Sequence, residues 1–517
     1  MLKKSIILFV GLIMAAVPSF ATTKTVGKSG AQFTSIQKAI DSFTEAEVTD
    51  GTPDVVEIID SAEYDEQVMI GGLIPDPDLK FPETQTGYLD SVIALTAKRD
   101  PFTLRGKDPA NRPKINPVSP TPVTYGVFTN DVTDHFIATF SYLGININVE
   151  NIEILQSSVI DADQYGMNGQ AGQATFKNVL FAHSGDASAG EALINFNNAA
   201  DIAGQGFDNS YYFVDCAFDG AINGERSEIN SIYFHGYTSG DATEAGVNIE
   251  DIAANMTFEN CKFLNAEEPM VIRGRDQANN VTLKNCFFSN NLHGARGAGK
   301  GSLMVENCIF TKNAIQTGDF ENETGAVETA GRSGFTPSVT VKNSLFVDNF
   351  NRDEVGDLGI NSKVGSILIK NDGTDPDVSI EQCTFVNDPI AIRFHDASGR
   401  PRKATVNNNI FKNAFIVLTA DAYFGNNADA NDDGLIQNVI ANGSGNIFDA
   451  NKVVVEEQDK LPNVKIQGSD ASVVFNNPAI ATDDPFSGPP YKVASGAPVG
   501  VGADLSPSTT VGEFMLY

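Results

Sequence analysis

One short pattern recurs along this 517-residue chain and limits its fold more than any other feature. In Val281–Phe288, two short apolar stretches flank Asn285, and Phe288 follows three residues after that asparagine. The polar residue that anchors each copy occupies these positions: Asn151, Asn178, Asp215, Asn260, Asn285, Asn307, Asn343, Gln382 and Asn408. The residue three positions later forms this column: Ile154, Phe181, Phe218, Phe263, Phe288, Phe310, Phe346, Phe385 and Phe411.

The irregular spacing of the copies selects among repeat folds. Successive phenylalanines lie between 22 residues apart, from Phe288 to Phe310, and 45 residues apart, from Phe218 to Phe263. Helical solenoids and propellers keep a nearly constant repeat, whereas a β-helix tolerates insertions that leave the coil as loops. An array of Ig-like sandwiches would not keep a phenylalanine at a fixed distance from the same turn residue. The sequence therefore predicts an all-β, right-handed parallel β-helix with rungs about 4.8 Å apart.

The anchor asparagines and the cysteines each have a place in such a coil. Asparagine tolerates the left-handed conformation that a sharp bend needs, and stacked amides can hydrogen-bond from coil to coil. All 5 cysteines directly follow an anchor residue, two positions before the inward phenylalanine. Side chains two positions apart on a strand point to the same face. We expect buried, free thiols, with disulfide formation as the less favoured alternative.

The two ends of the chain differ in character from the repeats. Residues 1–21 combine Lys3 and Lys4 with an apolar run, Ile6–Val17, which predicts a signal peptide. That run is shorter than the roughly 20 residues of a membrane span, so we expect no span. The mature protein is then secreted, to the periplasm, the cell surface or the medium.

Three further regions follow the signal peptide. Residues 22–50 predict an N-terminal cap, in which a short helix places Ile36, Ile40 and Phe43 on one face and Thr34 and Gln37 have capping-box spacing. Residues 51–450 form the expected β-helix, and residues 451–517 the C-terminal coils and cap.

The charge of the chain restricts its partners. Lys and Arg total 35 against 66 Asp and Glu, a formal net charge of −31. Such a surface argues against nucleic acid as a partner. It also repels acidic polymers unless a local basic patch or a bridging cation intervenes. We expect a monomer.

Several stretches resemble the pectin lyase-like superfamily. Thr23–Phe43 is similar to the start of pectinesterases, Val55–Ile70 and Phe102–Ile115 resemble first coils of the superfamily, and Tyr491–Gly500 resembles a closing segment of secreted β-helix proteins. The resemblance covers residues 23–505 and implies a carbohydrate groove. The chain has no Trp, so the Gly-Arg-Pro-Trp element of pectinesterases and the Trp-Ile-Asp-His element of pectate lyases are absent.

In this superfamily one further strand per coil lines the carbohydrate groove. Apolar and polar residues alternate in the candidate strands, which predicts this outward-facing set: Asn195, Asn197, Tyr233, His235, Arg273, Arg275, Glu328, Lys370, Arg393 and His395. Its basic groups would suit a carboxylated sugar chain. A register slip of one residue would reverse every side chain, and outward strand positions are often polar without a function. His293 and the Gly294–Gly301 run are expected in a loop.

Two classes of function fit these features. The first is a polysaccharide lyase-like protein that binds, and in the finer hypothesis cleaves, a pectate- or alginate-like polymer by β-elimination. Lys370 or Arg393 would be the base, Arg273 and Arg275 the carboxylate clamp, and Tyr233, His235 and His395 further contacts. A hydrolase is the variant, although no carboxylate pair is evident. The second class is a non-catalytic surface or matrix rod, which the same scaffold serves equally well.

Calcium is a candidate cofactor at two places. Asp276, Asp372 and Asp396 each end a candidate groove strand, where a carboxylate could hold the ion. Asp429, Asn431 and Asp433 match the first half of a calcium loop, but its twelfth position, Ile440, lacks the bidentate carboxylate.

Overall fold

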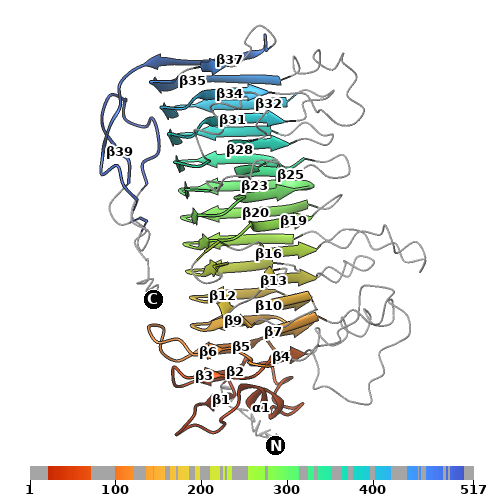
Figure 1. Ribbon diagram of the computed structural model, residues 1–517. Coiled ribbons are helices and arrows are strands. Elements are labelled where there is room, and N and C mark those ends of the chain that lie inside the picture. The colour runs from red at the N-terminus through yellow and green to blue at the C-terminus, as the bar shows by residue number, and fades with distance from the viewer. Residues whose placement is uncertain are drawn as a thin grey trace, which may run out of the picture.

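The structure is a computed structural model, and it shows a stack of coils with one short helix at its N-terminal end (Figure 1). It describes residues 21–71, 99–120, 136–143, 145–157, 163–170, 173–184, 192–197, 210–221, 225–226, 230–235, 254–273, 278–313, 324–330, 336–350, 364–370, 377–395, 402–420, 439–451, 453–455, 461–480, 485–486 and 490–505. Among these residues no helix is both long and apolar enough to cross a bilayer.

Each coil contributes one strand to each of three parallel sheets, here called the first, second and third sheet. The first sheet contains β1 (Thr23–Val26), β2 (Asp54–Ile58), β5 (Phe102–Gly106), β8 (Ile147–Glu150), β11 (Ala174–Lys177), β14 (Ser210–Val214), β17 (Ala254–Glu259), β20 (Ala278–Lys284), β23 (Lys300–Glu306), β26 (Ser338–Lys342), β29 (Asp377–Glu381), β32 (Arg402–Asn407), β35 (Val439–Asp449) and β37 (Val464–Asp470). The second sheet contains β3 (Glu63–Tyr64), β6 (Lys114–Ile115), β9 (Glu153–Ser157), β12 (Leu180–Ser184), β15 (Ala217–Asp219), β18 (Lys262–Leu264), β21 (Phe287–Ser289), β24 (Ile309–Thr311), β27 (Leu345–Val347), β30 (Thr384–Val386), β33 (Ile410–Lys412) and the end of β35.

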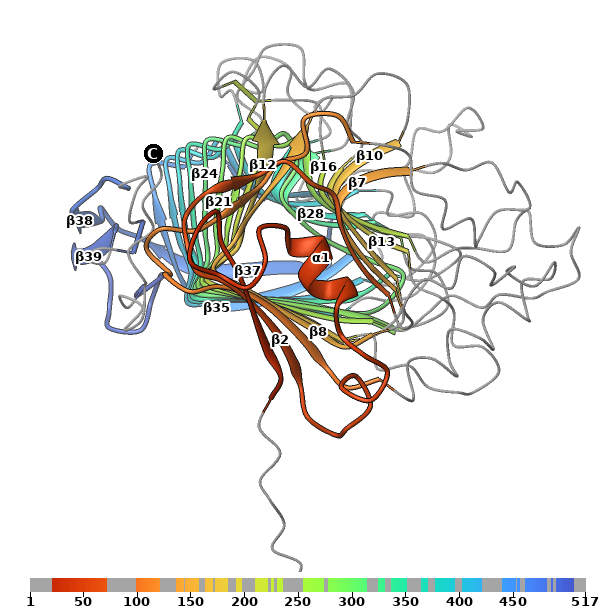
Figure 2. The ribbon, with the colours of Figure 1, turned by 90° about the horizontal axis from the view of Figure 1, so that it is seen from below.

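The third sheet consists of two consecutive parts. The N-terminal part contains β4 (Val68–Gly71), β7 (Phe136–Leu143), β10 (Asp163–Gln170), β13 (Ala192–Asn197), β16 (Asn230–His235) and β19 (Glu268–Arg273). The C-terminal part contains β22 (Ala295–Ala298), β25 (Thr324–Ala330), β28 (Val364–Lys370), β31 (Ile390–His395), β34 (Ile416–Ala420) and β36 (Val453–Val455). Seen along the axis from the N-terminal end, the chain turns clockwise as it recedes, so the β-helix is right-handed, as predicted (Figure 2).

The bend between the first and second sheets is made by the predicted anchor residues. Every one of them has a positive φ, between 47° at Asn343 and 57° at Asn307. Their amides also bond between coils: Nδ2 of Asn178 donates to Oδ1 of Asn151 over 2.9 Å, and Nδ2 of Asn343 donates to Oδ1 of Asn307 over 3.1 Å. Both expectations for the asparagines are confirmed.

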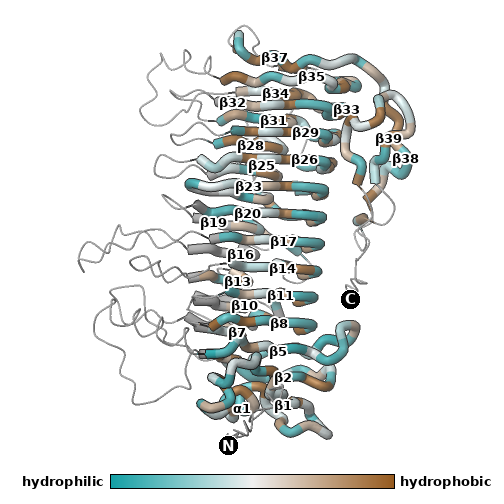
Figure 3. Tube along the Cα trace, turned by 180° about the vertical axis from the view of Figure 1, so that it is seen from behind, coloured by the Kyte–Doolittle hydropathy of each residue, from teal (hydrophilic) through white to brown (hydrophobic). Residues whose placement is uncertain are grey.

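The phenylalanine column forms a continuous stack in the core. Neighbouring rings from Phe181 to Phe448 lie nearly parallel, with centroids from 4.5 Å apart at Phe263–Phe288 to 5.9 Å at Phe411–Phe448. Hydrophobic and hydrophilic residues are interspersed along the coils (Figure 3). The core is therefore a column of side chains that repeats from rung to rung.

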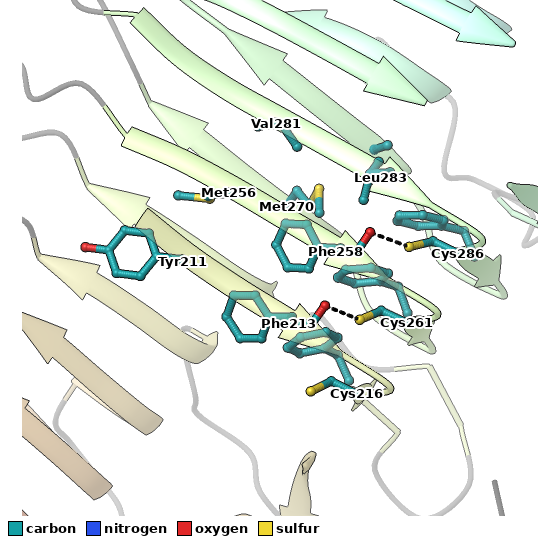
Figure 4. Packing of buried hydrophobic residues seen from close by; sticks show 14 of the residues in the cluster. Tyr211, Phe213, Cys216, Met256, Phe258, Cys261, Met270, Val281, Leu283 and Cys286 are labelled. Carbon is teal, nitrogen blue, oxygen red and sulfur yellow. Dashed lines mark hydrogen bonds between the residues drawn. The ribbon is translucent and has the colours of Figure 1, made fainter. Parts of the chain in front are cut away.

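The five cysteines are free and buried, as the sequence predicted. Their thiols donate to backbone carbonyls of the coil below: Sγ of Cys261 lies 3.4 Å from the oxygen of Phe213, and Sγ of Cys286 lies 3.5 Å from the oxygen of Phe258 (Figure 4). Burial raises the pKa of the Cys383 thiol to about 12. A thiol that stays protonated in an apolar column is inert, which fits a packing role.

A second ladder, which the sequence analysis did not predict, lies inside the corner between the second and third sheets. Asn291, Asn313, Asn349 and Asp388 are completely buried there. Each amide oxygen accepts from the residue on the rung below; for example, Oδ1 of Asn349 accepts from the backbone N of Asn313 over 3.2 Å and from its Nδ2 over 2.8 Å. Asp388 ends the ladder and accepts from the backbone N of Asn349 over 2.8 Å and from Oγ of Ser366 over 2.5 Å.

The helix α1 (Ile36–Asp41) closes the N-terminal end of the core (Figure 2). Ile36, Ile40 and Phe43 are buried on its inner side, as predicted. The predicted capping box between Thr34 and Gln37 is wrong, because Ser35 is the N-cap and accepts from the backbone N of Lys38 over 3.2 Å. Glu66 completes the cap by accepting from the backbone N of Ile36 over 2.8 Å. The carboxylate acceptor at this helix end therefore comes from a residue that is remote in sequence, and the predicted Gln37 does not supply it.

The C-terminal segment folds back along the outer face of the second sheet (Figure 1). The antiparallel strands β38 (Val474–Asn476) and β39 (Lys492–Ser495) begin this return, and residues 500–505 then run beside coils formed by earlier parts of the chain. There the backbone N of Asp504 donates to Oδ1 of Asn343 over 2.6 Å. Outward apolar residues such as Phe287, Ile309 and Leu345 form one buried cluster with Phe486, Tyr491 and Leu505. The segment thus acts as a strap over an apolar stripe.

Replacing a central ring should lower the free energy of unfolding strongly. Phe288→Ala removes a completely buried ring with stacked neighbours on both sides, so we expect a loss of about 3–5 kcal/mol in a denaturant titration. Met304→Ala, at a side chain 42% exposed on the adjoining coil, should cost less than about 0.5 kcal/mol. Equal losses for the two variants would contradict the stacked core.

Asp388 should make stability depend on pH. Burial raises the pKa of its carboxyl to about 7, although bonds from Ser366 and Asn349 oppose that rise. Because the folded-state pKa lies above the unfolded value of about 3.9, the protonated folded form is favoured, and this stability is fully present below pH 4 and is lost as the pH rises to 7. Asp388→Asn continues the ladder without a titrating group, so the fall in unfolding free energy between pH 4 and 7 should become smaller. An unchanged slope would show that Asp388 is already ionised in the folded protein.

Candidate functional site

The strands predicted to line a groove all belong to the third sheet, and their register agrees with the predicted one. Asn195 of β13 pairs with Tyr233 of β16. Two residues further along these strands, His235 of β16 pairs with Arg273 of β19 and with Asn197 of β13 in the backbone register. The backbone therefore brings the positions of Tyr233, His235 and Arg273 onto neighbouring rungs.

Two outward side chains of this part are buried and carry an oxygen atom that has no hydrogen-bond partner among the described residues. Ser141 lies between the core residues Phe140 and Tyr142, and Asn195 lies between Ile194 and Phe196. They are 2% and 1% exposed, and Oγ of Ser141 and Oδ1 of Asn195 have no partner in the part of the chain that the structure describes. An unsatisfied buried polar atom costs about 1–3 kcal/mol, so these two atoms point to a polar ligand or water.

A cluster of ionisable side chains occupies the middle of the same sheet. We call it the Glu328 cluster; its members come from four successive rungs and are Glu268, His293, Arg296, Glu328 and Lys370. Arg296 and Glu328 pair directly in the register of β22 and β25, and each follows a core residue, which turns both outward.

Glu328 is the centre of the cluster and is completely buried. Its Oε1 accepts from Nε of Arg296 over 2.5 Å, while Oε2 lies 3.3 Å from Nδ1 of His293 and 3.8 Å from Nζ of Lys370. Glu268 lies on the other side: its Oε2 accepts from Nη1 of Arg296 over 3.0 Å, and its Oε1 is 3.7 Å from Nε2 of His293. Arg296 and His293 thus each bridge two carboxylates.

The charges in the cluster stabilise one another's ionised forms. Burial by itself would raise the pKa of Glu328, but Arg296, Lys370 and His293 hold it well below its ordinary value. Burial would likewise lower the pKa of Arg296, and Glu328 and Glu268 raise it instead. Glu328 therefore stays ionised at any physiological pH and cannot serve as a proton donor. The more accessible members are Lys370, with a side chain 18% exposed, and Glu268, at 22%.

The two remaining predicted cationic residues of the third sheet are not on a solvent face. Arg393 lies between Ile392 and Phe394 of the core and pairs with Leu368, so it points out of the coil as expected. It is nevertheless 0% exposed, and His395 is 3% exposed. The expectation that these two side chains face solvent is wrong, because alternation decides only which side of the strand a residue is on, and further chain can cover the outer side as well. Arg393 is therefore a poor choice for a base that must reach a substrate.

The other predicted site residues lie outside the described residues. They are Arg275, Asp276, Asp372, Asp396, Asp429, Asn431 and Asp433. Across the described ranges, no group of three or more His, Cys, Asp and Glu side chains is arranged to hold a metal ion. The calcium hypothesis stays a prediction.

The sequence analysis missed Glu268, His293 and Arg296. It expected His293 and Gly294–Gly301 in a loop, whereas Ala295–Ala298 is strand β22. The glycines hid the strand, and Gly294 is required there because a Cβ would lie 1.8 Å from the carbonyl oxygen of Ala326. Counting from the anchors would have found the position: Glu268 is eight residues after Asn260, and His293 is eight after Asn285.

Comparisons with known proteins add little to this geometry. No family model matches the chain, and no curated protein matches its sequence. Among solved structures, tailspike protein 3 of bacteriophage CBA120 aligns with a TM-score of 0.41 and 12% identity over 86% of this chain, which spans 61% of that tailspike. The periplasmic alginate epimerase AlgG aligns with a TM-score of 0.34 and 8% identity, over 87% of this chain and 84% of the epimerase.

Removing the central charge should destabilise the protein. Glu328→Gln keeps the size of the side chain but leaves Arg296 and Lys370 without their shared carboxylate, so we expect the free energy of unfolding to fall by about 3–5 kcal/mol at pH 7. The matched control is Glu306→Gln at an outward position of the first sheet, where the loss should stay below about 1 kcal/mol. A Glu328→Gln variant as stable as the control would show that the cluster is not a coupled network.

Proposed function

We propose that this protein, which has the right-handed β-helix fold of the pectin lyase-like superfamily, is exported and binds an acidic polysaccharide along the outer face of its third sheet. The observation that carries the proposal is the Glu328 cluster: a fully buried carboxylate that holds Arg296 of the preceding rung and Lys370 of the following rung at fixed positions. Strands of a β-helix need no buried ion on their outer side, and perturbed ionisable groups gather at functional sites.

The local charge supports an anionic ligand. The chain as a whole carries −31, whereas the cluster combines two carboxylates with Arg296, Lys370 and His293, so its formal charge is zero with a neutral histidine and positive with a protonated one. A carboxylated sugar would thus meet much less repulsion here than elsewhere on the surface. Toward the N-terminus, the unsatisfied buried atoms of Ser141 and Asn195 provide further polar groups on the outer side of the same sheet.

The finer hypothesis is cleavage by β-elimination. That reaction needs a cation against the uronate carboxylate and a base near the proton α to it. Lys370 is the better candidate for the base because its side chain is partly exposed while Arg393 is buried. Arg296, anchored by both carboxylates, would neutralise the uronate, alone or with Arg273. Any bound calcium would supply additional neutralisation.

Binding can be tested directly with polygalacturonate and alginate. The mature wild-type chain should bind at least one of them at low salt, and affinity should fall as salt screens the charges over about 8–10 Å. Lys370→Ala should weaken binding at least tenfold, which is about 1.4 kcal/mol. Lys342→Ala, an exposed lysine on the outer face of the first sheet, serves as the matched control and should change affinity less than twofold. Absence of binding at low salt, with and without calcium, would overturn the proposal.

The same samples separate an enzyme from a binding protein. A lyase releases products whose unsaturated uronate absorbs in the ultraviolet, and Lys370→Ala should abolish that signal at a temperature at which thermal melting shows that the variant is folded. Binding without any product would assign a recognition role. The complete burial of Leu368, Arg393 and Thr419 on the outer side favours the second candidate, a stiff structural rod, which would bind neither polymer.

A further inference from the structure

A hollow on a different face of the molecule, the outer face of the first sheet, interrupts an otherwise regular surface. In the outward row of this sheet, charges alternate in sign from rung to rung, and the register pairs these residues in turn: Lys284, Glu306, Lys342 and Glu381. Each charge therefore has opposite neighbours along the axis. The next residue in the row is Asn407 of β32, where the alternation stops.

The strand that follows Asn407 leaves the regular pattern. Oδ1 of Asn407 accepts from the backbone N of Ser444 over 2.9 Å, and the register between β35 and β37 shifts between Gly443 and Asn446. Gly443 allows this close approach, because a Cβ there would lie 1.8 Å from the carbonyl oxygen of Val406. Such a bulge re-aims neighbouring side chains, and bulges are over-represented next to functional sites.

The bulge opens a hollow of about 360 Å³ across β32, β35 and β37. Around Gly443, its walls are the side chains of Thr405, Asn407, Asn442, Ser444, Lys465 and Gln467. The polar groups of these side chains are hydroxyls and amides, apart from the ammonium group of Lys465. None of the residues that line the hollow carries a carboxylate. The volume is within the range of small-molecule sites, which carry a few polar groups that fix the ligand's orientation.

We propose that this hollow is a second saccharide-binding site, which takes one or two units of an acidic glycan. Hydroxyls and amides both donate and accept, which matches the hydroxyl groups of a sugar ring. Lys465 offers a charge-assisted bond to a sugar carboxylate. A lining without carboxylates admits such a ligand on a chain of net charge −31.

The strands around the hollow belong to the first sheet and those of the Glu328 cluster to the third sheet, so the two sites would bind separate stretches of a polymer or separate chains. Figure 2 shows the two sheets on different sides of the coil. Two sites on one rigid scaffold raise the avidity for a long polymer without any new contact. Binding at the hollow therefore does not depend on any activity at the third sheet. The two proposals can be tested separately.

The experiment uses the full mature chain carrying Lys370→Ala, in which binding at the third sheet should be weakened at least tenfold, and trigalacturonate as the probe in isothermal titration calorimetry. We expect saturable binding with one site per chain. Asn442→Asp, added to this background, places a carboxylate in the hollow and should weaken binding at least tenfold, and Lys465→Ala should do the same. Lys403→Ala changes an exposed lysine of β32 that does not line the hollow, and it should alter affinity less than twofold.

The outcomes that overturn the proposal are distinct. Absence of saturable binding in the Lys370→Ala chain, or binding that Asn442→Asp leaves unchanged, would show that the hollow is not a saccharide site. Equal affinity for trigalacturonate and neutral maltotriose, together with no effect of Lys465→Ala, would show that the carboxylate of the sugar does not contribute to recognition by Lys465. Thermal melting of each variant checks that a loss of binding does not come from unfolding, because Asn442 and Lys465 are both exposed.

Discussion

The spacing between rungs governs nearly everything else in this molecule. Parallel strands pair about 4.8 Å apart, so each residue of a coil has its counterpart of the next coil directly above it. Aromatic rings on neighbouring rungs can stack at this distance, as Phe263 and Phe288 do with centroids 4.5 Å apart. Amides at the same distance form ladders, whereas like charges would repel. This explains why the asparagine and phenylalanine columns repeat the same residue while the outward column through Lys284, Glu306 and Lys342 alternates in sign.

Burial of polar groups distinguishes the two ladder systems. The anchor asparagines at the outer bend are partly exposed, except for Asn260, and Asp215 or Gln382 takes their place on two rungs. The inner ladder is fully buried, and there each amide must use its donor and its acceptor inside the protein. Asp388 occupies the end of that ladder, where an acceptor is needed and Ser366 supplies one more donor. The position of a carboxyl group in the core is thus set by hydrogen-bond demand.

The outer face of the third sheet follows a different rule from the other faces. Its outward positions hold Ser141, Asn195, Glu328 and Arg393, all nearly or completely buried, whereas the outward positions of the first sheet are largely exposed. Buried charge is costly unless it is paired, and the cluster meets that condition with Arg296 shared between Glu268 and Glu328. Such an arrangement holds cations in place at low local net charge, which is the property that an acidic glycan would require of this surface.

The sequence by itself determined the coil: the anchor positions, the inward phenylalanines and the free cysteines were all predicted, because each follows from a local pattern that successive rungs repeat. Tertiary structure alone decided what lies over the coil. Neither the burial of Arg393 nor the Glu66 cap on α1 can be read from strand alternation, since both depend on chain that is remote in sequence. The cluster of Glu268, His293 and Arg296 was missed because the Gly294–Gly301 run concealed strand β22, and stacking of the coils then brings Arg296 within hydrogen-bond distance of Glu268.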